Sequence, residues 1–211
     1  MTQNREALYE IMTGQPVIPV IVIDNADDAV PMANALVAGG LPAIEITLRT
    51  DAAMASIERI AKEVPDAIVG AGTVLNGHQY EQVVSAGARF AVSPGFTREI
   101  AAAALGSAVP LLPGSTSASE IMRAIELGYT LLKFFPAEQA GGAPFLKSLA
   151  SPFGSVQFCP TGGVSPSNAA DYLSLPNVLC VGGSWVAPKA AVQAGDWDKV
   201  EALAKDAAKL S

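Results

Sequence analysis

One lysine in this chain lies where a charged side chain is not expected. Lys133 falls in the apolar run of residues 131–137, whereas the other lysines fall in helical or loop segments. Lysine is almost never fully buried unless it is paired or used. Two interpretations follow for Lys133. It is either an amine that forms a Schiff base with a carbonyl substrate, or one half of a structural ion pair with Glu45.

A second apolar run carries charged residues at alternate positions. Glu45, Thr47 and Arg49 are each two residues apart, so they share one face of a predicted strand. A carboxylate and a guanidinium that point into a protein are costly unless they are paired or bind a ligand. Burial and a neighbouring guanidinium favour the neutral, nucleophilic form of a lysine amine, whereas an ionised glutamate favours the ammonium form. The residues alone therefore leave both roles of Lys133 open.

Two Gly-Gly turns in the last third of the chain indicate a site for an anion. Gly162 and Gly163 end one apolar run, and Gly182 and Gly183 lie near the end of the next. Glycine lets backbone N–H groups approach phosphate oxygens, and the N-terminus of a following helix adds its dipole. Each pair alone is a weak signal, because tight turns use glycine in any case. Together, after the last two of eight runs, they predict phosphate binding.

The composition excludes several classes of protein. A net charge of −7 over 211 residues argues against a nucleic-acid-binding surface. His78 is the only histidine, and Cys159 and Cys180 are the only cysteines, so neither a zinc site nor a histidine-dependent nucleophile is expected. The apolar stretches are interrupted by Pro, Gly and polar residues, so no membrane span is predicted. We expect a cytoplasmic protein with reduced thiols.

A repeated strand–helix pattern must position these residues. Eight short apolar runs, typical of buried parallel strands, cover residues 16–23, 43–48, 67–73, 90–95, 109–115, 131–137, 156–163 and 177–185. Helices are predicted at 28–39, 52–64, 79–87, 98–105, 117–128, 143–150 and 167–173, with further helices at 5–12 and 196–210.

This alternation is compatible with a closed (β/α)8 barrel or with an open doubly wound sheet. The number of runs, their even spacing and the lack of a Gly-x-Gly-x-x-Gly motif after the first run favour the barrel. The sequence therefore predicts an α/β protein, a (β/α)8 TIM barrel with an extra N-terminal helix. We expect residues 1–211 to form a single domain.

The motifs at the ends of these runs resemble those of a known family. EITLRT at residues 45–50, GAGT at 70–73, SPG at 93–95, KFFPAE at 133–138, FCPTGG at 158–163 and GGSW at 182–185 are similar to motifs of the 2-keto-3-deoxy-6-phosphogluconate (KDPG) and 4-hydroxy-2-oxoglutarate (KHG) aldolase family. The resemblance extends from about residue 16 to residue 188, and the motifs come in the family order.

The resemblance implies a class I aldolase on a (β/α)8 barrel that forms a homotrimer and needs no metal or cofactor. Its substrate would be a phosphorylated 2-keto acid, KDPG, which is cleaved reversibly to pyruvate and glyceraldehyde 3-phosphate. Activity on 4-hydroxy-2-oxoglutarate, which yields pyruvate and glyoxylate, is also implied.

Individual residues take roles from the resemblance. It implies that Lys133 forms the imine with the keto carbon and that Glu45 is the general base, which moves protons through water. It implies that Arg49 and Thr73 hold the pyruvyl carboxylate.

The remaining matched residues would shape the rest of the pocket. By the same resemblance, Pro94 and Phe135 form the apolar wall beside the imine, and Thr161 contacts the hydroxyl at the carbon that is cleaved. The implied phosphate ligands are Gly162, Gly163 and Ser184.

Two positions depart from the family pattern, and neither touches the implied catalytic set. Ser115 stands where an aliphatic residue is common, and residues 139–143 form a variable loop. Two other functions also fit the residues. One is a sugar-phosphate epimerase or isomerase on the same barrel, in which Lys133 acts only electrostatically. The other is a non-catalytic sensor of a phosphorylated ligand, against which the presence of Glu45, Arg49 and Lys133 argues.

Overall fold

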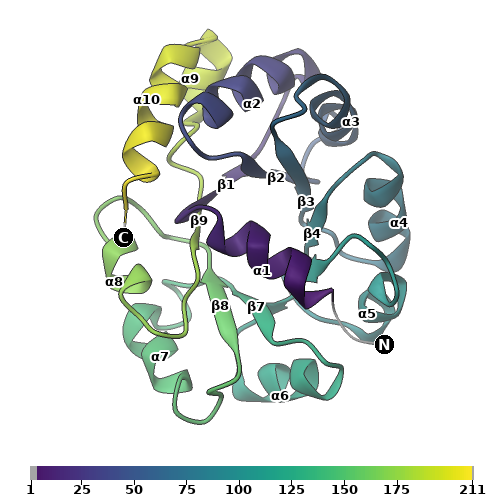
Figure 1. Cartoon of the computed structure of the whole chain (residues 1–211), viewed down its shortest axis with the longest axis vertical. Helices are drawn as coiled ribbons and strands as arrows, with labels where there is room; N and C mark the ends of the chain where they lie inside the picture. The colour runs from purple at the N-terminus through teal and green to yellow at the C-terminus, as the bar shows by residue number, and fades with distance from the viewer. Residues whose placement is uncertain (1–3, 211) are drawn as a thin grey trace.

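The computed structural model describes residues 4–210, and it has a parallel sheet curled into a ring that helices surround (Figure 1). The strands are β1 (Val17–Ile21), β2 (Ala43–Thr47), β3 (Ile68–Gly72), β4 (Phe90–Val92), β5 (Leu111–Leu112), β6 (Gly114–Ser115), β7 (Leu131–Phe134), β8 (Gln157–Pro160) and β9 (Val181–Gly183). Every predicted apolar run contains at least one of these strands, and the strands are shorter than the runs.

Eight strand positions close the ring, although nine strands are numbered. One sheet has the order β5-β4-β3-β2-β1-β9 and the other has the order β6-β7-β8. The fifth run is divided at Pro113, whose nitrogen carries no hydrogen for a ladder bond. As a result, β5 pairs with β4 and β6 pairs with β7, so this one segment joins the two sheets.

Parallel bridges close the other junction of the ring. Thr161 at the end of β8 pairs with Gly182 of β9, and Phe158 pairs with Val178 just before β9. Because β9 also pairs with β1, the sheet has no free edge at this point. The closed ring confirms the predicted barrel and excludes the open doubly wound sheet.

Helices follow most of the strands and cover the outside of the ring, whereas α1 precedes β1 and lies across one end (Figure 1). They are α1 (Arg5–Thr13), α2 (Ala29–Ala38), α3 (Ala53–Glu63), α4 (Gly77–Ser85), α5 (Arg98–Ala104), α6 (Ala118–Glu126), α7 (Gly142–Leu149), α8 (Ala169–Leu173), α9 (Lys189–Ala194) and α10 (Trp197–Ala207), with a 3-10 turn η1 (Ala26–Asp28). The sequence does not predict α9, which lies between the last predicted strand and the predicted helix at 196–210. Figure 1 shows α9 and α10 packed beside α2, at the outer side of β1 and β9.

Alternation along each strand separates two apolar cores. Ile44 and Ile46 of β2 belong to the large core between the strands and the outer helices. A smaller core inside the ring contains Ile18, Phe90 and Leu131 from the strands. This division leaves Glu45, which lies between Ile44 and Ile46, on the inner face of the barrel.

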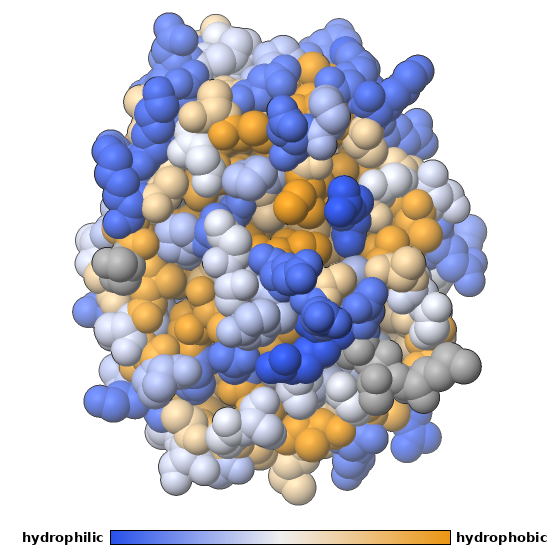
Figure 2. Space-filling model, viewed as in Figure 1, coloured by the Kyte–Doolittle hydropathy of each residue, from blue (hydrophilic) through white to orange (hydrophobic). Residues whose placement is uncertain are grey.

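The predicted N-terminal helix closes one end of the barrel. Leu8 and Met12 are one helical turn apart on α1, and both are buried in the inner core. Figure 1 shows α1 lying across the centre of the ring. On this face hydrophilic side chains gather over the middle of the molecule (Figure 2). Because the strands run parallel, the opposite end collects all of their C-terminal ends, where a barrel of this class carries its site.

The two cysteines are buried free thiols, as predicted. Cys159 and Cys180 belong to the inner core, and the Cys180 thiol lies 3.7 Å from the sulfur of Met12. A hydrogen bond with Cys159 and complete burial raise the pKa of the Cys180 thiol well above its usual value. His78 is exposed in the first turn of α4, so it fits a surface role. Among the residues described, no helix has the length and apolar character to cross a membrane.

One buried hydroxyl on the outer face of the ring allows a test of the packing. Ser115 pairs with Phe134, one residue beyond the pair of Gly114 and Lys133, so its side chain faces the helices. Within residues 4–210, the buried Ser115 Oγ finds no hydrogen-bond partner. A buried polar group without a partner costs about 1–3 kcal/mol.

We therefore expect Ser115→Ala to raise the free energy of unfolding by about 1 kcal/mol in urea or thermal denaturation. The matched control is Thr116→Val at the next position, because the Thr116 hydroxyl donates to Phe135 O at 2.6 Å. That variant should lose about 1 kcal/mol. A loss of stability in Ser115→Ala equal to that of the control would contradict this account.

Candidate active site

The centre of the site is an ion pair buried inside the barrel. Lys133 Nζ lies 3.2 Å from Glu45 Oε1, and the two residues are 4% and 3% exposed. The pair joins β7 to β2, which lie on different sides of the ring (Figure 1). Both residues are near the C-terminal ends of their strands, because Phe134 ends β7 and Thr47 ends β2. The structure therefore brings together Lys133 and Glu45, whose pairing the sequence left as one of two alternatives.

Glycines on the neighbouring strands allow close approaches at and beside this pair. A Cβ on Gly72, at the end of β3, would overlap the Glu45 carboxylate. Across from Lys133 stands Gly114 of β6, whose missing side chain leaves room for the carbonyl of Pro94. The sequence analysis assigned no role to Gly72. No local signal reveals one, because the close approach is to a residue 27 positions earlier in the chain.

Arg49 and Thr73 form a second pair at the rim of the same two strands, β2 and β3. The Arg49 Nε donates a hydrogen bond of 3.1 Å to Thr73 Oγ1. Thr73 has a φ of 58°, a left-handed conformation that is rare for a residue with a branched Cβ. Strain of this kind costs of the order of 1–3 kcal/mol and concentrates at functional sites. The exposed guanidinium of Arg49 is thus held at the open end of the barrel, just beyond Glu45.

Phe135 and Pro94 supply apolar surface beside the lysine. The Lys133 Nζ lies 5.4 Å from the centre of the Phe135 ring. Pro94 follows β4, and its backbone lies against Gly114, which is the register partner of Lys133. A carbonyl carbon attached to the lysine nitrogen would therefore have an aromatic ring close by. Both residues are half-buried, which leaves their outer surface available to a ligand.

The β8 and β9 ends bring Thr161 and the first Gly-Gly turn to the same mouth. Thr161 is buried, and a Cβ on Gly182 would overlap its hydroxyl. Gly162 has a φ of 99° and Gly163 a φ of 78°, so both use backbone conformations that other residues rarely adopt. A Cβ on Gly162 would lie 3.3 Å from the Phe135 ring, which places the turn next to the lysine strand.

The predicted residues differ in how closely the structure links them. One series of contacts runs from Glu45 to Lys133, from there to the Phe135 ring and on to Gly162. A separate hydrogen bond links Arg49 to Thr73. Ser184 directly follows β9, and its side chain is exposed. Its position at this end of the barrel is therefore known from the strand that it follows. The structure also brings Glu138 against the Gly162–Gly163 turn, although the sequence analysis gave Glu138 no role.

The arrangement offers groups that can act as a nucleophile, as a proton acceptor and as ligands for two anions. An amine next to a carboxylate can attack a carbonyl and exchange protons with the groups that form. The guanidinium of Arg49 matches a carboxylate, and glycine N–H groups suit a phosphate. In the part of the chain that the structure describes, no cluster of three or more His, Cys, Asp or Glu side chains is placed to hold a metal ion.

Comparison with known proteins agrees with this chemistry. The family model "KDPG and KHG aldolase" matches residues 8–203. The KHG/KDPG aldolase of Escherichia coli K12 is 53% identical over 207 residues, which cover 98% of this chain and 97% of that protein.

Two solved structures have nearly the same fold. The KDPG aldolase of Legionella pneumophila, which holds pyruvate as a covalent carbinolamine intermediate, is 47% identical. It superposes with a TM-score of 0.93 over 95% of this chain and 98% of that one. The enzyme of Zymomonas mobilis ZM4 with 3-phosphoglycerate is 48% identical, with a TM-score of 0.92 over 98% and 97% of the two chains. The protein whose buried lysine and glutamate meet at the mouth of this barrel belongs to the KDPG and KHG aldolase family.

Proposed function

We propose that this chain is a class I aldolase that cleaves 2-keto-3-deoxy-6-phosphogluconate reversibly to pyruvate and glyceraldehyde 3-phosphate. The observation that carries the proposal is the contact of 3.2 Å between Lys133 and Glu45, both buried at the C-terminal ends of their strands. Relatives that match almost the whole chain bear the name of this activity, and one of them holds pyruvate covalently.

The reaction begins at the lysine. The neutral amine of Lys133 attacks the keto carbon of the substrate, and the resulting carbinolamine loses water to give an imine. Glu45 accepts and returns the protons of these steps, directly or through a water molecule, since its carboxylate lies within hydrogen-bond distance of the nitrogen.

Carbon–carbon cleavage follows from the imine. Removal of the proton from the C4 hydroxyl breaks the C3–C4 bond, releases glyceraldehyde 3-phosphate and leaves the electron pair in an enamine on Lys133. Protonation of the enamine at C3 gives the pyruvyl imine, and hydrolysis releases pyruvate. The lysine nitrogen is the electron sink, so the chemistry requires no metal or cofactor.

The residues around the lysine position the substrate. Arg49 and Thr73 would hold the pyruvyl carboxylate, in agreement with their mutual hydrogen bond at the rim. Pro94 and Phe135 would enclose the imine carbon, and Thr161 would contact the hydroxyl at the cleaved carbon. The phosphate would be bound by Gly162, Gly163 and Ser184, on the side of the mouth formed by β8 and β9.

We also propose cleavage of 4-hydroxy-2-oxoglutarate to pyruvate and glyoxylate. This substrate shares the keto acid that Lys133, Arg49 and Thr73 would bind, and it lacks the phosphate. The E. coli relative is named for both activities. In an epimerase or a ligand sensor, Lys133 would have no covalent role. Trapping of an adduct on Lys133 therefore distinguishes an aldolase from both.

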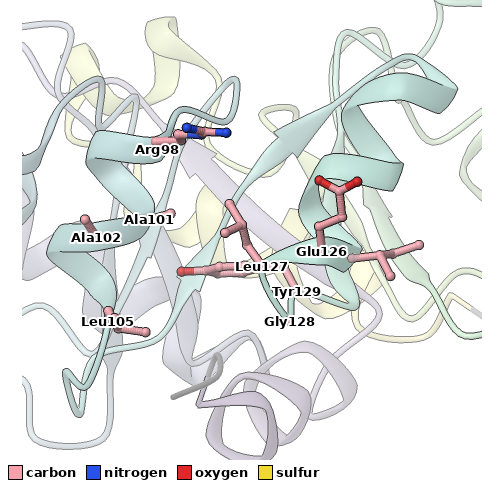
Figure 3. A pocket seen from close by; sticks show the side chains of 9 residues that line it. Arg98, Ala101, Ala102, Leu105, Glu126, Leu127, Gly128 and Tyr129 are labelled. Atoms are coloured by element: carbon pink, nitrogen blue, oxygen red, sulfur yellow. The ribbon is translucent and has the colours of Figure 1, made fainter.

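A homotrimer is part of the proposal, and a groove between α5 and α6 is its candidate interface. The groove has a volume of about 650 Å³ and an apolar lining that includes Leu105, Ile125 and Leu127 (Figure 3). With Met122, these residues are four of the eight exposed large apolar side chains within residues 4–210. Such concentrated apolar exposure is typical of a surface that another chain covers.

Opposite charges at the groove favour a second copy of this chain as its occupant. Figure 3 shows Arg98 on the α5 side and Glu126 on the α6 side. In a rotationally symmetric trimer each contact joins two different surfaces, so the α5 side of one copy would meet the α6 side of the next and Arg98 would pair with Glu126 across the contact.

Two further properties are proposed on narrower support. Residues 1–211 form a single domain, because β1 and β9, from opposite ends of the chain, pair in the same ring. A cytoplasmic location is supported by Cys159 and Cys180, which lie in neighbouring parts of the inner core as free thiols.

The covalent step gives the first test. Incubation with pyruvate and borohydride should place a reduced adduct on Lys133, and peptide mass spectrometry should locate it there. The exposed lysines Lys147 and Lys189 serve as internal controls and should stay unmodified. Lys133→Ala should give no adduct and no turnover. Efficient KDPG cleavage without any adduct at Lys133 would reject the class I mechanism.

A substitution at Glu45 distinguishes proton transfer from imine formation. We expect Glu45→Gln to lower kcat by about 100-fold or more, because the amide keeps the shape but accepts no proton. Pyruvate should still be trapped on Lys133. The matched control is Glu201→Gln on α10, a surface residue that pairs with Lys205 and should have no effect on kcat. An unchanged kcat in Glu45→Gln would remove this residue as the base.

The interface proposal predicts a change of oligomeric state. Leu105→Glu places a charge in the apolar groove, so light scattering should find the mass of one chain in place of three. The control is Tyr9→Glu on α1, another exposed apolar residue on a different face, which should leave a trimer. A trimer that persists in Leu105→Glu places the interface elsewhere.

A further inference from the structure

The Gly162–Gly163 turn packs against Glu138, a residue that has no part in the proposed reaction. A Cβ on Gly163 would lie 2.6 Å from Glu138 Cγ, so the stem of Glu138 fills the space beside this glycine. The Glu138 N–H also donates a hydrogen bond of 3.1 Å to Gly162 O. Glu138 thus contacts both glycines, one through its backbone and the other through its side chain.

A buried tyrosine fixes the other end of the Glu138 side chain. The hydroxyl of Tyr172 in α8 donates a short hydrogen bond to Glu138 Oε1. Tyr172 is fully buried, so its ring cannot move without disturbing the core. Burial, together with this hydrogen bond, raises the pKa of Tyr172 above its usual value, so the hydroxyl remains a donor at neutral pH.

Glu138 connects the turn to the strand that carries the lysine. It lies five residues after Lys133, and the preceding Ala137 N–H donates to Thr161 O at 2.8 Å. On its far side the turn is held by Asn168, whose side-chain amide donates to Gly163 O at 3.2 Å. The distance between the turn and the lysine is therefore set by residues outside the substrate pocket.

We infer that Glu138 and Tyr172 are positioning residues that hold the Gly162–Gly163 turn at the distance from Lys133 that a phosphorylated substrate requires. This inference rests on the proposed function, because it assumes that the turn binds the phosphate. Neither residue touches the reacting atoms. Their hydrogen bond sets the backbone N–H groups in place before the substrate arrives, which lowers the cost of ordering the turn on binding.

A consequence is that the pair matters only for substrates with a phosphate. KDPG places its keto group at Lys133 and its phosphate at the turn, so a displaced turn weakens binding. The shorter 4-hydroxy-2-oxoglutarate has no phosphate to bind at the turn, so its cleavage does not depend on the position of the turn. A general loss of stability or a distorted Lys133 would instead affect both substrates.

The test compares the two substrates in purified full-length variants. In Tyr172→Phe and Glu138→Ala we expect KM for KDPG to rise by about tenfold, with kcat/KM for 4-hydroxy-2-oxoglutarate within about twofold of wild type. Glu138→Gln keeps an oxygen that accepts the hydrogen bond from Tyr172. Its KM for KDPG should therefore lie much closer to that of wild type than the KM of Glu138→Ala does. The matched control is Tyr80→Phe, which removes another buried tyrosine hydroxyl, bonded to Val109 O at 2.5 Å and remote from the turn.

Each outcome decides between the inference and its alternatives. Equal losses on both substrates, an unchanged KM for KDPG, or the same KM increase in Tyr80→Phe would overturn the inference. Trapping of pyruvate on Lys133, run on every variant, keeps the proposed function separate because pyruvate has no phosphate. If the wild-type chain neither traps pyruvate nor cleaves KDPG, the proposed function fails and the inference fails with it.

Discussion

The buried contact between Lys133 and Glu45 is the constraint on which the rest of the site depends. Two charged groups removed from water cost several kcal/mol each, and only close pairing compensates for that cost. The surrounding residues maintain the pairing. Gly72 leaves space for the carboxylate, Gly114 on the strand beside Lys133 leaves space for the backbone of Pro94, and the Phe135 ring lies near the lysine nitrogen. The same proximity that makes the pair tolerable also places a proton acceptor beside a nucleophile.

A second constraint comes from the way the interior is filled. Below the pair, the barrel is packed with apolar side chains, and Leu8 and Met12 of α1 close that end. Above it, glycines allow close packing, because Gly72, Gly163 and Gly182 each leave room for a neighbouring side chain. The chain's net charge of −7 does not argue against the proposed anionic substrate, because Arg49 and the N–H groups of the turn would supply the local attraction.

Membership of the family bears on a question that the geometry alone leaves open, namely whether Lys133 has a chemical or a structural role. A lysine paired with a glutamate is also found in purely structural ion pairs, and the contact of 3.2 Å fits either role. The relatives share the fold over almost the whole chain, and one carries a carbinolamine of pyruvate. The contact supplies the geometry of the proposed Schiff-base role of Lys133, and the match to the family supports that role over a purely structural ion pair.

Apart from α9, the sequence by itself determined the order of strand runs and helices, the inward face of β2 and the unusual place of Lys133, because hydrophobic periodicity is a local property of the chain. It also carried the motifs of the family. Only the tertiary structure decided that Pro113 divides the fifth strand, that Gly72 makes room for Glu45 and that Glu138 meets Tyr172 beside the Gly162–Gly163 turn. These contacts join residues from different strand–helix units, and no local pattern encodes which side chains the closing of the barrel brings together.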